Sequence, residues 1–182
     1  MLPVGDDLRL KPETLAAAIA ADEAAGRKPF LAVASAGATS SGAIDPIGPL
    51  GELCAAHGIW LHVDAAYGGF AVLTERGRSA LEHIALADSI TLDPHKWLYQ
   101  PYECGCLLVR DGRALRQAFE ISSDYLRDAD VTSQEVNFAD LGLQLTRTTR
   151  AFKLWLSLRR SGSTRSASRS TAASISPSSR TG

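Results

Sequence analysis

The stretch Ile59-Trp60-Leu61-His62-Val63-Asp64 decides the fold, because its apolar run closed by an acid predicts a strand. A second apolar segment, Ser89-Ile90-Thr91-Leu92, runs into Asp93-Pro94-His95-Lys96. Asp64 and Lys96 are 32 residues apart, which is the length of one strand–helix–strand step in an α/β domain. The sequence therefore predicts two parallel strands, the first followed by an acid and the second by a lysine.

The flanking segments continue the alternation of strands and helices. We predict further strands at 30–34 and 105–109 and helices at 12–26, 46–57, 78–85, 112–119 and 140–160, the last with a break near Thr146. The continuous apolar run at 30–34 is typical of a strand buried on both faces, and the polar segment 122–137 is predicted to be a loop. The fold class is thus α/β, with a mostly parallel sheet flanked by helices.

Composition and charge narrow the functional classes. The chain has 182 residues, of which 45% are hydrophobic and 21% charged, and a formal net charge of −1. These values predict one globular domain with neither a basic stripe for nucleic acid nor a polybasic membrane patch. No apolar run reaches the ~20 residues that span a bilayer, and the first residues lack the pattern of a signal peptide. We therefore expect a cytoplasmic protein.

The three cysteines, Cys54, Cys104 and Cys106, are an odd number in a chain without export signals. This predicts free thiols rather than a disulfide framework. Cys104 and Cys106 lack a second ligand pair at suitable spacing, so we predict no metal site and interpret them as small buried strand residues.

Polar residues follow the predicted strands at the points where each strand ends. Thr39, Asp64, Asp93, His95 and Lys96 all come after the carboxyl end of a strand. Ligands in parallel sheets bind outside these ends. A lysine that can form a Schiff base and an acid that can hold a pyridinium nitrogen are the two protein groups that pyridoxal 5′-phosphate (PLP) requires. The pattern therefore indicates a PLP site.

Three motifs in order resemble the group II PLP-dependent decarboxylases, and most closely the aromatic-L-amino-acid decarboxylases. They are Gly42-Ala43-Ile44-Asp45-Pro46-Ile47, Trp60 to Tyr67, and Asp93-Pro94-His95-Lys96-Trp97-Leu98, with Lys153-Leu154-Trp155 as a later match. The resemblance runs from about Leu8 to Arg160. It implies the large domain of a fold-type I PLP-dependent transferase-like enzyme, incomplete here, which works as a homodimer with active sites at the interface.

The resemblance also implies roles for individual residues. Lys96 resembles the lysine that holds PLP covalently as an internal aldimine, and Asp64 the acid that pairs with the pyridine nitrogen. Ala66 resembles a small residue packed against one face of the ring. Without the resemblance, an aspartate after a strand is more often a helix cap or a turn residue.

Further matches surround this pair. His95 and Asp93 match positions near the cofactor phosphate; some relatives carry Asn in place of Asp93, and an acid beside a phosphate needs a compensating donor. Thr39 matches a hydroxyl residue close to the ring and Asp64. Ala38 departs from the usual pair of threonines.

Tyr125 matches the tyrosine of a mobile loop that returns a proton to the substrate carbon after decarboxylation. Relatives with phenylalanine there tend towards oxidative deamination, so Tyr125 favours decarboxylation; the alternative is a tyrosine that packs a helix end. His57, His62 and His83 match no such role, and we interpret them as structural or surface groups.

The resemblance implies decarboxylation of a small-molecule amino acid, most simply an aromatic one, to its amine and CO₂. Tyr67 and Trp97 favour the aromatic substrate class. Two alternatives stay open: a decarboxylase of an acidic amino acid such as glutamate, and a catalytically inert fragment that never binds PLP. The family's chains are longer, so we expect the histidine that stacks on the cofactor, part of the phosphate site, much of the substrate pocket and the small domain to be absent from residues 1–160.

Residues 161–182 differ sharply in composition from the partial PLP-binding domain of residues 1–160. Nine of these 22 residues are serine and none is acidic, which is typical of a disordered tail. A second interpretation is a shifted reading frame, because TCN serine codons read one base earlier encode Phe, Leu, Ile or Val. The shifted text would give an amphipathic helix. Resequencing the gene near codon 160 tests this hypothesis.

Overall fold

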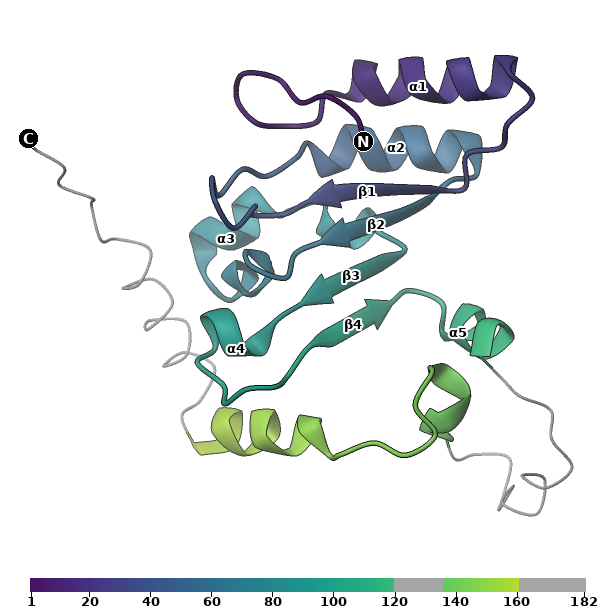
Figure 1. Cartoon of the computed structure of the whole chain (residues 1–182). Helices are drawn as coiled ribbons and strands as arrows, with labels where there is room; N and C mark the ends of the chain where they lie inside the picture. The colour runs from purple at the N-terminus through teal and green to yellow at the C-terminus, as the bar shows by residue number, and fades with distance from the viewer. Residues whose placement is uncertain (120–135, 161–182) are drawn as a thin grey trace, which may run out of the picture.

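A four-stranded sheet organises the chain, with its strands in the order β1-β2-β3-β4 (Figure 1). In this computed structural model residues 1–119 and 136–160 are described. The strands are β1 (Leu31–Ser35), β2 (Trp60–Asp64), β3 (Ser89–Leu92) and β4 (Cys106–Val109). The first three run parallel and β4 is antiparallel to β3, so the predicted α/β class with a mostly parallel sheet is confirmed.

Two helices cover one face of the sheet. Helix α2 (Ile47–His57) packs on β1 and β2, and α1 (Pro12–Ala24) packs on α2 (Figure 1). Proline is tolerated at the start of α1 because the N–H group that it lacks would have no acceptor within the helix. Gly58 ends α2 in the left-handed conformation with φ 64°. The core lies between these helices and the sheet; its largest fully buried side chains include Leu50, Leu61 and Val63.

The opposite face of β1 is open among the described residues. Leu31 and Val33 are 48% and 53% exposed, whereas Ala34 on the other face is 1% exposed. The prediction that this strand is buried on both faces is therefore wrong. An apolar run indicates a strand that prefers burial, but it does not say whether a second layer of helices is present.

The connection from β2 to β3 differs in extent from the predicted helix at 78–85. It consists of η1 (Gly69–Leu73), α3 (Glu75–Ala80) and η2 (Ile84–Leu86). Helix α3 begins early because the Thr74 hydroxyl caps it, accepting the Gly77 N–H at 3.0 Å. The prediction was wrong because it overlooked this cap and extended one helix across two short ones.

Beyond β3 the elements are short. They are α4 (Pro94–Trp97), β4, α5 (Gly112–Phe119), η4 (Phe138–Leu141) and a helix at 150–160. The helix predicted over 140–160, with a break near Thr146, forms only after that break, because Gly142 is extended and the backbone stays irregular up to residue 149. The first half of this prediction is therefore wrong. Most of the predicted loop at 122–137, and the tail at 161–182, lie outside the described residues, so the tail interpretations stay predictions.

Within residues 1–119 and 136–160, no helix is both long and apolar enough to cross a membrane. The three cysteines are free thiols, as predicted; Cys54 and Cys104 are buried and Cys106 is partly exposed. No cluster of three or more His, Cys, Asp or Glu side chains suited to a metal ion occurs in that part of the chain.

Candidate active site

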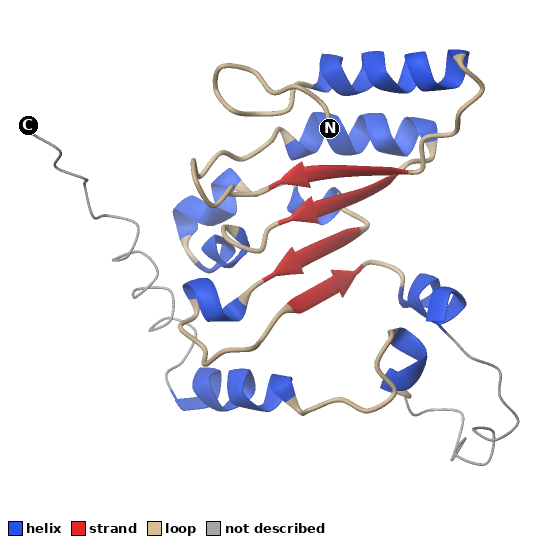
Figure 2. Ribbon diagram, viewed as in Figure 1, coloured by secondary structure: helices blue, strands red, loops and turns tan. Residues whose placement is uncertain are grey.

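The carboxyl ends of β1, β2 and β3 meet at one edge of the sheet, as the strand arrows in Figure 2 show. Asp64 is the last residue of β2 and is paired in register with Ser35 of β1 and Thr91 of β3. Lys96 lies in α4, which begins at Pro94 directly after β3. The fold thus brings the predicted acid and the predicted lysine to the same edge.

The Asp64 carboxylate is exposed, and only one of its two oxygens accepts a hydrogen bond from a described residue. Its Oδ1 atom accepts the backbone N–H of Ala66 at 3.1 Å, which fixes the side chain at the turn after β2. Its Oδ2 atom accepts no hydrogen bond from any described residue. One carboxylate oxygen is therefore available to a protonated ring nitrogen.

Asp93, His95 and Lys96 form a charged cluster next to this edge. Asp93 Oδ1 lies 2.5 Å from His95 Nδ1, and Asp93 Oδ2 lies 3.7 Å from Lys96 Nζ. The Asp93 side chain is 14% exposed, His95 is 30% exposed and Lys96 is 33% exposed. The contact between Asp93 and His95 lacks hydrogen-bond geometry, so both buried atoms are left without a hydrogen-bond partner in the described part of the chain.

Two aromatic pairs involve the residues on either side of Lys96. The Tyr102 ring meets His95 at 5.2 Å between centroids, and Tyr67 meets Trp97 edge-on at 6.0 Å. Edge-to-face pairs of this kind fix ring orientation as well as burying apolar area. The residues on both sides of Lys96 are thus held by aromatic contacts.

The turns after β1 and β2 approach each other closely. Gly37 has φ 88°, and a Cβ there would lie 2.7 Å from the Gly68 Cα, so only glycine fits. Ala66 lies between Asp64 and this contact. Thr39 is exposed in the turn after β1, at the same edge of the sheet.

The structure therefore gathers six of the seven predicted site residues at one sheet edge. Asp64 and Ala66 follow β2; Asp93, His95 and Lys96 follow β3; Thr39 follows β1. Thr39 makes no hydrogen bond to the other five within the described ranges. Tyr125 lies outside the described residues, so its role stays a prediction.

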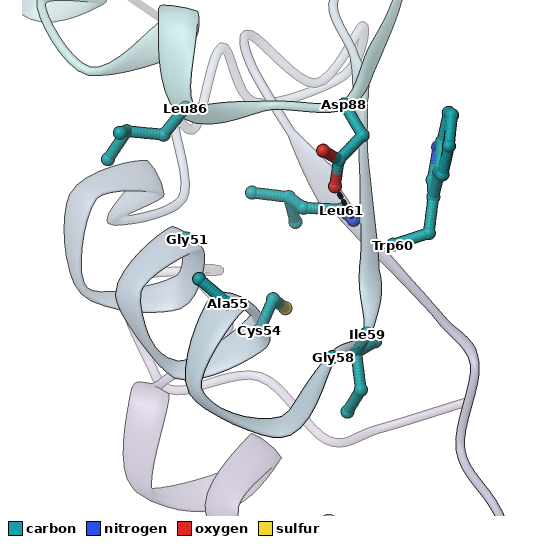
Figure 3. A pocket seen from close by; sticks show the side chains of 9 residues that line it. All are labelled: Gly51, Cys54, Ala55, Gly58, Ile59, Trp60, Leu61, Leu86 and Asp88. Atoms are coloured by element: carbon teal, nitrogen blue, oxygen red, sulfur yellow. Dashed lines mark hydrogen bonds between the residues drawn. The ribbon is translucent and has the colours of Figure 1, made fainter. Parts of the chain in front are cut away.

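A cavity of about 300 Å³ lies at the other end of β2, between α2 and the sheet (Figure 3). Its wall includes Cys54, Trp60 and Asp88, and Asp88 accepts the Leu61 N–H at 2.8 Å. Burial, with a smaller effect from the Asp88 charge, raises the pKa of the Cys54 thiol. A thiol with a raised pKa is a poor nucleophile, so this cavity offers no comparable chemistry.

Sequence reasoning missed two polar side chains that organise this region. Asp45 is 8% exposed and accepts the backbone N–H groups of Leu10 at 2.8 Å and of Ser35 at 2.7 Å. His62 bridges the hydroxyls of Ser89 and Thr91 across β2 and β3. The signal for Asp45 was its place in the Gly42–Ile47 motif; nothing local in the sequence pointed to the His62 contacts.

A mostly parallel sheet with an acid and a lysine at the carboxyl ends of its strands is the arrangement expected of a cofactor-binding α/β protein. The pyridoxal-dependent decarboxylase conserved domain matches residues 1–171, and the chain belongs to this family.

Individual relatives agree with this assignment. The chain is 42% identical to the aromatic-L-amino-acid decarboxylase of Bacillus atrophaeus, over 85% of this chain and 32% of that protein. It is 41% identical to tyrosine/DOPA decarboxylase 5 of Papaver somniferum, over 86% of this chain and 30% of that protein. The crystal structure of Oryza sativa TDC with PLP and tryptamine superposes with a TM-score of 0.84 at 36% identity, covering 89% of this chain and 33% of that one. The chain therefore spans about a third of the length of the curated relatives that it matches.

The residues of the site fit PLP. Asp64 offers a free carboxylate oxygen, and Lys96 is partly exposed and held loosely by one acid at 3.7 Å. The His95 ring is 30% exposed, and Nε2, the nitrogen that does not face Asp93, is a potential donor for a phosphate oxygen. Asp93 is compatible with the PLP phosphate only if His95 and Lys96 compensate its negative charge, because an uncompensated carboxylate would repel the phosphate.

Proposed function

We propose that this chain forms the cofactor-binding part of a PLP-dependent decarboxylase that converts an aromatic L-amino acid to its amine and CO₂. One observation carries the proposal: Asp64 ends β2, and Lys96 lies in α4 directly after the neighbouring parallel strand β3, at the same sheet edge. Asp64 has one carboxylate oxygen without a hydrogen bond among the described residues, and Lys96 Nζ lies 3.7 Å from Asp93. Family membership supplies the reaction class.

In this proposal Lys96 joins PLP covalently as a Schiff base. Its Nζ atom would have to lose a proton before attacking the aldehyde, and Asp93 Oδ2 lies 3.7 Å from it. Asp64, whose Oδ2 atom is without a hydrogen bond among the described residues, would pair with the pyridine nitrogen of bound PLP and keep it protonated. When bound, PLP supplies an electron sink for the electron pair that CO₂ leaves behind.

The aromatic substrate class is favoured over the acidic one. The two curated relatives are named for aromatic amino acids, and the structural relative was solved with tryptamine. In this chain Tyr67 and Trp97 form an edge-on pair next to Lys96, which gives the edge an apolar wall.

Two further parts of the proposal rest on the resemblance alone: the complete enzyme acts as a homodimer, and Tyr125 returns a proton to the substrate carbon. Each concerns residues or assemblies beyond those described, and each follows from the family assignment. A cytoplasmic location, expected from the sequence, completes the proposal.

Covalent retention of PLP tests the central claim. The purified chain is mixed with PLP, reduced with borohydride and analysed by mass spectrometry, with Lys96→Ala as the test variant. Lys28→Ala is the matched control, because Lys28 is exposed in the loop before β1. We expect the adduct in wild type and in Lys28→Ala but not in Lys96→Ala. An unlabelled wild type would support the inert fragment, and an adduct in Lys96→Ala would contradict the role of Lys96.

Substrate class is tested separately by release of CO₂. Tyrosine, tryptophan, dihydroxyphenylalanine and glutamate are supplied to the PLP-loaded chain and to a version extended to the length of its relatives. We expect release from the extended protein with aromatic substrates. Release from glutamate alone would overturn the aromatic assignment while leaving the PLP site intact.

A further inference from the structure

His62 lies in the middle of β2, and two hydroxyls of β3 hold its ring. Its Nδ1 atom is 2.8 Å from Ser89 Oγ, and its Nε2 atom is 3.1 Å from Thr91 Oγ1. Trp60, two residues earlier on the same strand, places its Nε1 atom 2.8 Å from the same Ser89 oxygen. These four side chains form a continuous hydrogen-bonded chain across the two strands.

The direction of donation along these hydrogen bonds follows from the donors available. The Trp60 indole can only donate, so Ser89 Oγ accepts from it. Ser89 is 7% exposed, and its own hydroxyl hydrogen has one remaining acceptor among the described residues, His62 Nδ1. Leaving that hydrogen unpaired in a buried position would be unfavourable. His62 therefore accepts at Nδ1 and carries its proton on Nε2, which donates to Thr91.

The bridge spans the first and third pairs of the β2–β3 ladder. His62 is the register partner of Ser89, and Asp64 is the register partner of Thr91. The imidazole ring joins the first pair to the third by contacting both β3 hydroxyls. A slip of one residue would break both contacts, so the ring fixes the register where the strands end.

Register at this point decides whether one cofactor can reach two protein groups. Asp64 ends β2, and Lys96 follows β3 in α4. The backbone ladder between the two strands holds only three register pairs. A rigid aromatic ring bonded to Lys96 can reach Asp64 only if the ends of β2 and β3 keep their relative position along the strand axis. A displacement of about 1 Å strongly weakens binding at such sites.

We propose that His62 is a positioning residue for the PLP site. Its bridge to Ser89 and Thr91 sets the position of Asp64 along the strand axis relative to Lys96. The role rests on the proposed function, since it presumes that both residues engage one ring. It differs from a general contribution to stability, because removing the bridge should weaken cofactor binding chiefly through Asp64.

The bridge itself is tested without cofactor. Long-range ¹H–¹⁵N spectra of the histidine rings are recorded near pH 8, where an ordinary histidine is neutral. We expect His62 in a single tautomer with the proton on Nε2. His57, partly exposed and 3.0 Å from Glu23, is the internal comparison on the surface. A His62 ring averaged between tautomers, or protonated on Nδ1, would overturn the proposal.

The positioning role is tested by a double-mutant cycle on PLP affinity, measured from Schiff-base absorbance. We expect His62→Leu to weaken binding about tenfold, and His62→Gln, which keeps a donor, to recover part of the loss. In an Asp64→Asn background, His62→Leu should add less than about twofold, because Asp64 no longer depends on register. His57→Leu should leave affinity unchanged, and melting curves verify that each variant is folded.

The outcomes separate this proposal from the proposed function. A wild-type chain without a Schiff base contradicts the proposed function, and the positioning role falls with it. A wild-type chain that binds PLP no more tightly than His62→Leu overturns the positioning role alone. Equal losses with and without Asp64 would also overturn it, since they indicate a purely structural histidine.

Discussion

The two parts of the described chain are stabilised in different ways. Up to Cys104, buried apolar side chains fill the space between α1, α2 and the sheet. After Cys104 none of the described residues is buried. There the helix at 150–160 is joined to the loop at 100–104 by polar contacts: Arg150 to Glu103, Lys153 to two backbone carbonyls, and Ser157 to Gln100.

The candidate site lies where these two parts meet, which explains how it is built. Asp64 is positioned by β2, a strand with one buried face. The His95 ring, in contrast, contacts Tyr102 in the loop that the later helix holds. We infer that the first part sets the position of the acid, whereas the second part affects the surroundings of the lysine. Substitutions in the two parts should therefore differ in the size of their effect on stability and in the region of the molecule that they affect.

The largest contrast should come from deleting matched leucine side chains. Leu50 in α2 is fully buried, whereas Leu156 in the later helix is 47% exposed. Leu50→Ala should reduce the free energy of unfolding by about 2–5 kcal/mol, because it leaves a cavity in the core. Leu156→Ala should change it by less than about 1 kcal/mol. Urea denaturation measures both, and equal losses would show that the comparison is wrong.

A smaller loss should follow removal of the buried acid in the first part. Asp45→Ala leaves the N–H groups of Leu10 and Ser35 without their acceptor and should destabilise the fold by about 1–3 kcal/mol. Asp22→Ala removes an exposed acid that pairs with Arg27, and it should change stability by about 0.5 kcal/mol or less. Thermal unfolding followed by circular dichroism compares them. A harmless Asp45→Ala would show that water readily replaces the carboxylate.

Local patterns predicted the elements of the first part well. The strands at 60–64 and 89–92 and the helix at 47–57 all lie within a residue or two of their predicted bounds. Apolar runs and the helix-ending Gly58 specify them locally. For the same reason the strand-end positions of Asp64 and Lys96 could be predicted.

The failures have two kinds of cause. The Thr74 cap of α3 and Gly142 in the predicted helix over 140–160 are local signals that the prediction overlooked. The exposure of Leu31 instead depends on which layers are present. The His62 bridge joins residues 27 and 29 positions apart, so it required the strand register. No local period contains that information.

Detaching the later helix should have a modest and local effect. Lys153 Nζ donates to the backbone carbonyls of Pro101 at 2.9 Å and of Glu103 at 2.6 Å. Lys153→Met keeps the apolar stem but removes both bonds, which should cost about 1 kcal/mol. Hydrogen exchange measured by mass spectrometry should speed up in 150–160 and stay unchanged in α2. Lys28→Met is the control, and equal exchange in both variants would refute the contact's importance.

The smallest effect should come from an exposed carboxylate and should depend on pH. The Arg150 guanidinium, which donates from Nε at 3.0 Å, lowers the pKa of the Glu103 carboxyl. The lowered folded-state pKa adds stability that is fully present above the unfolded value of about 4.3 and is lost as the pH falls through the folded value. Glu103→Gln should therefore lower the melting temperature by about 1 °C at pH 7, with the difference vanishing in acid.

The control for this measurement is Glu52→Gln, since Glu52 is exposed on α2 and makes no ion pair among the described residues. Its melting temperature should follow wild type from pH 7 to pH 3. A Glu103→Gln deficit that persists at pH 3 would mean that the glutamate acts through packing rather than charge. The second part of the chain would then be held by contacts that do not titrate, and its difference from the first part would be one of burial alone.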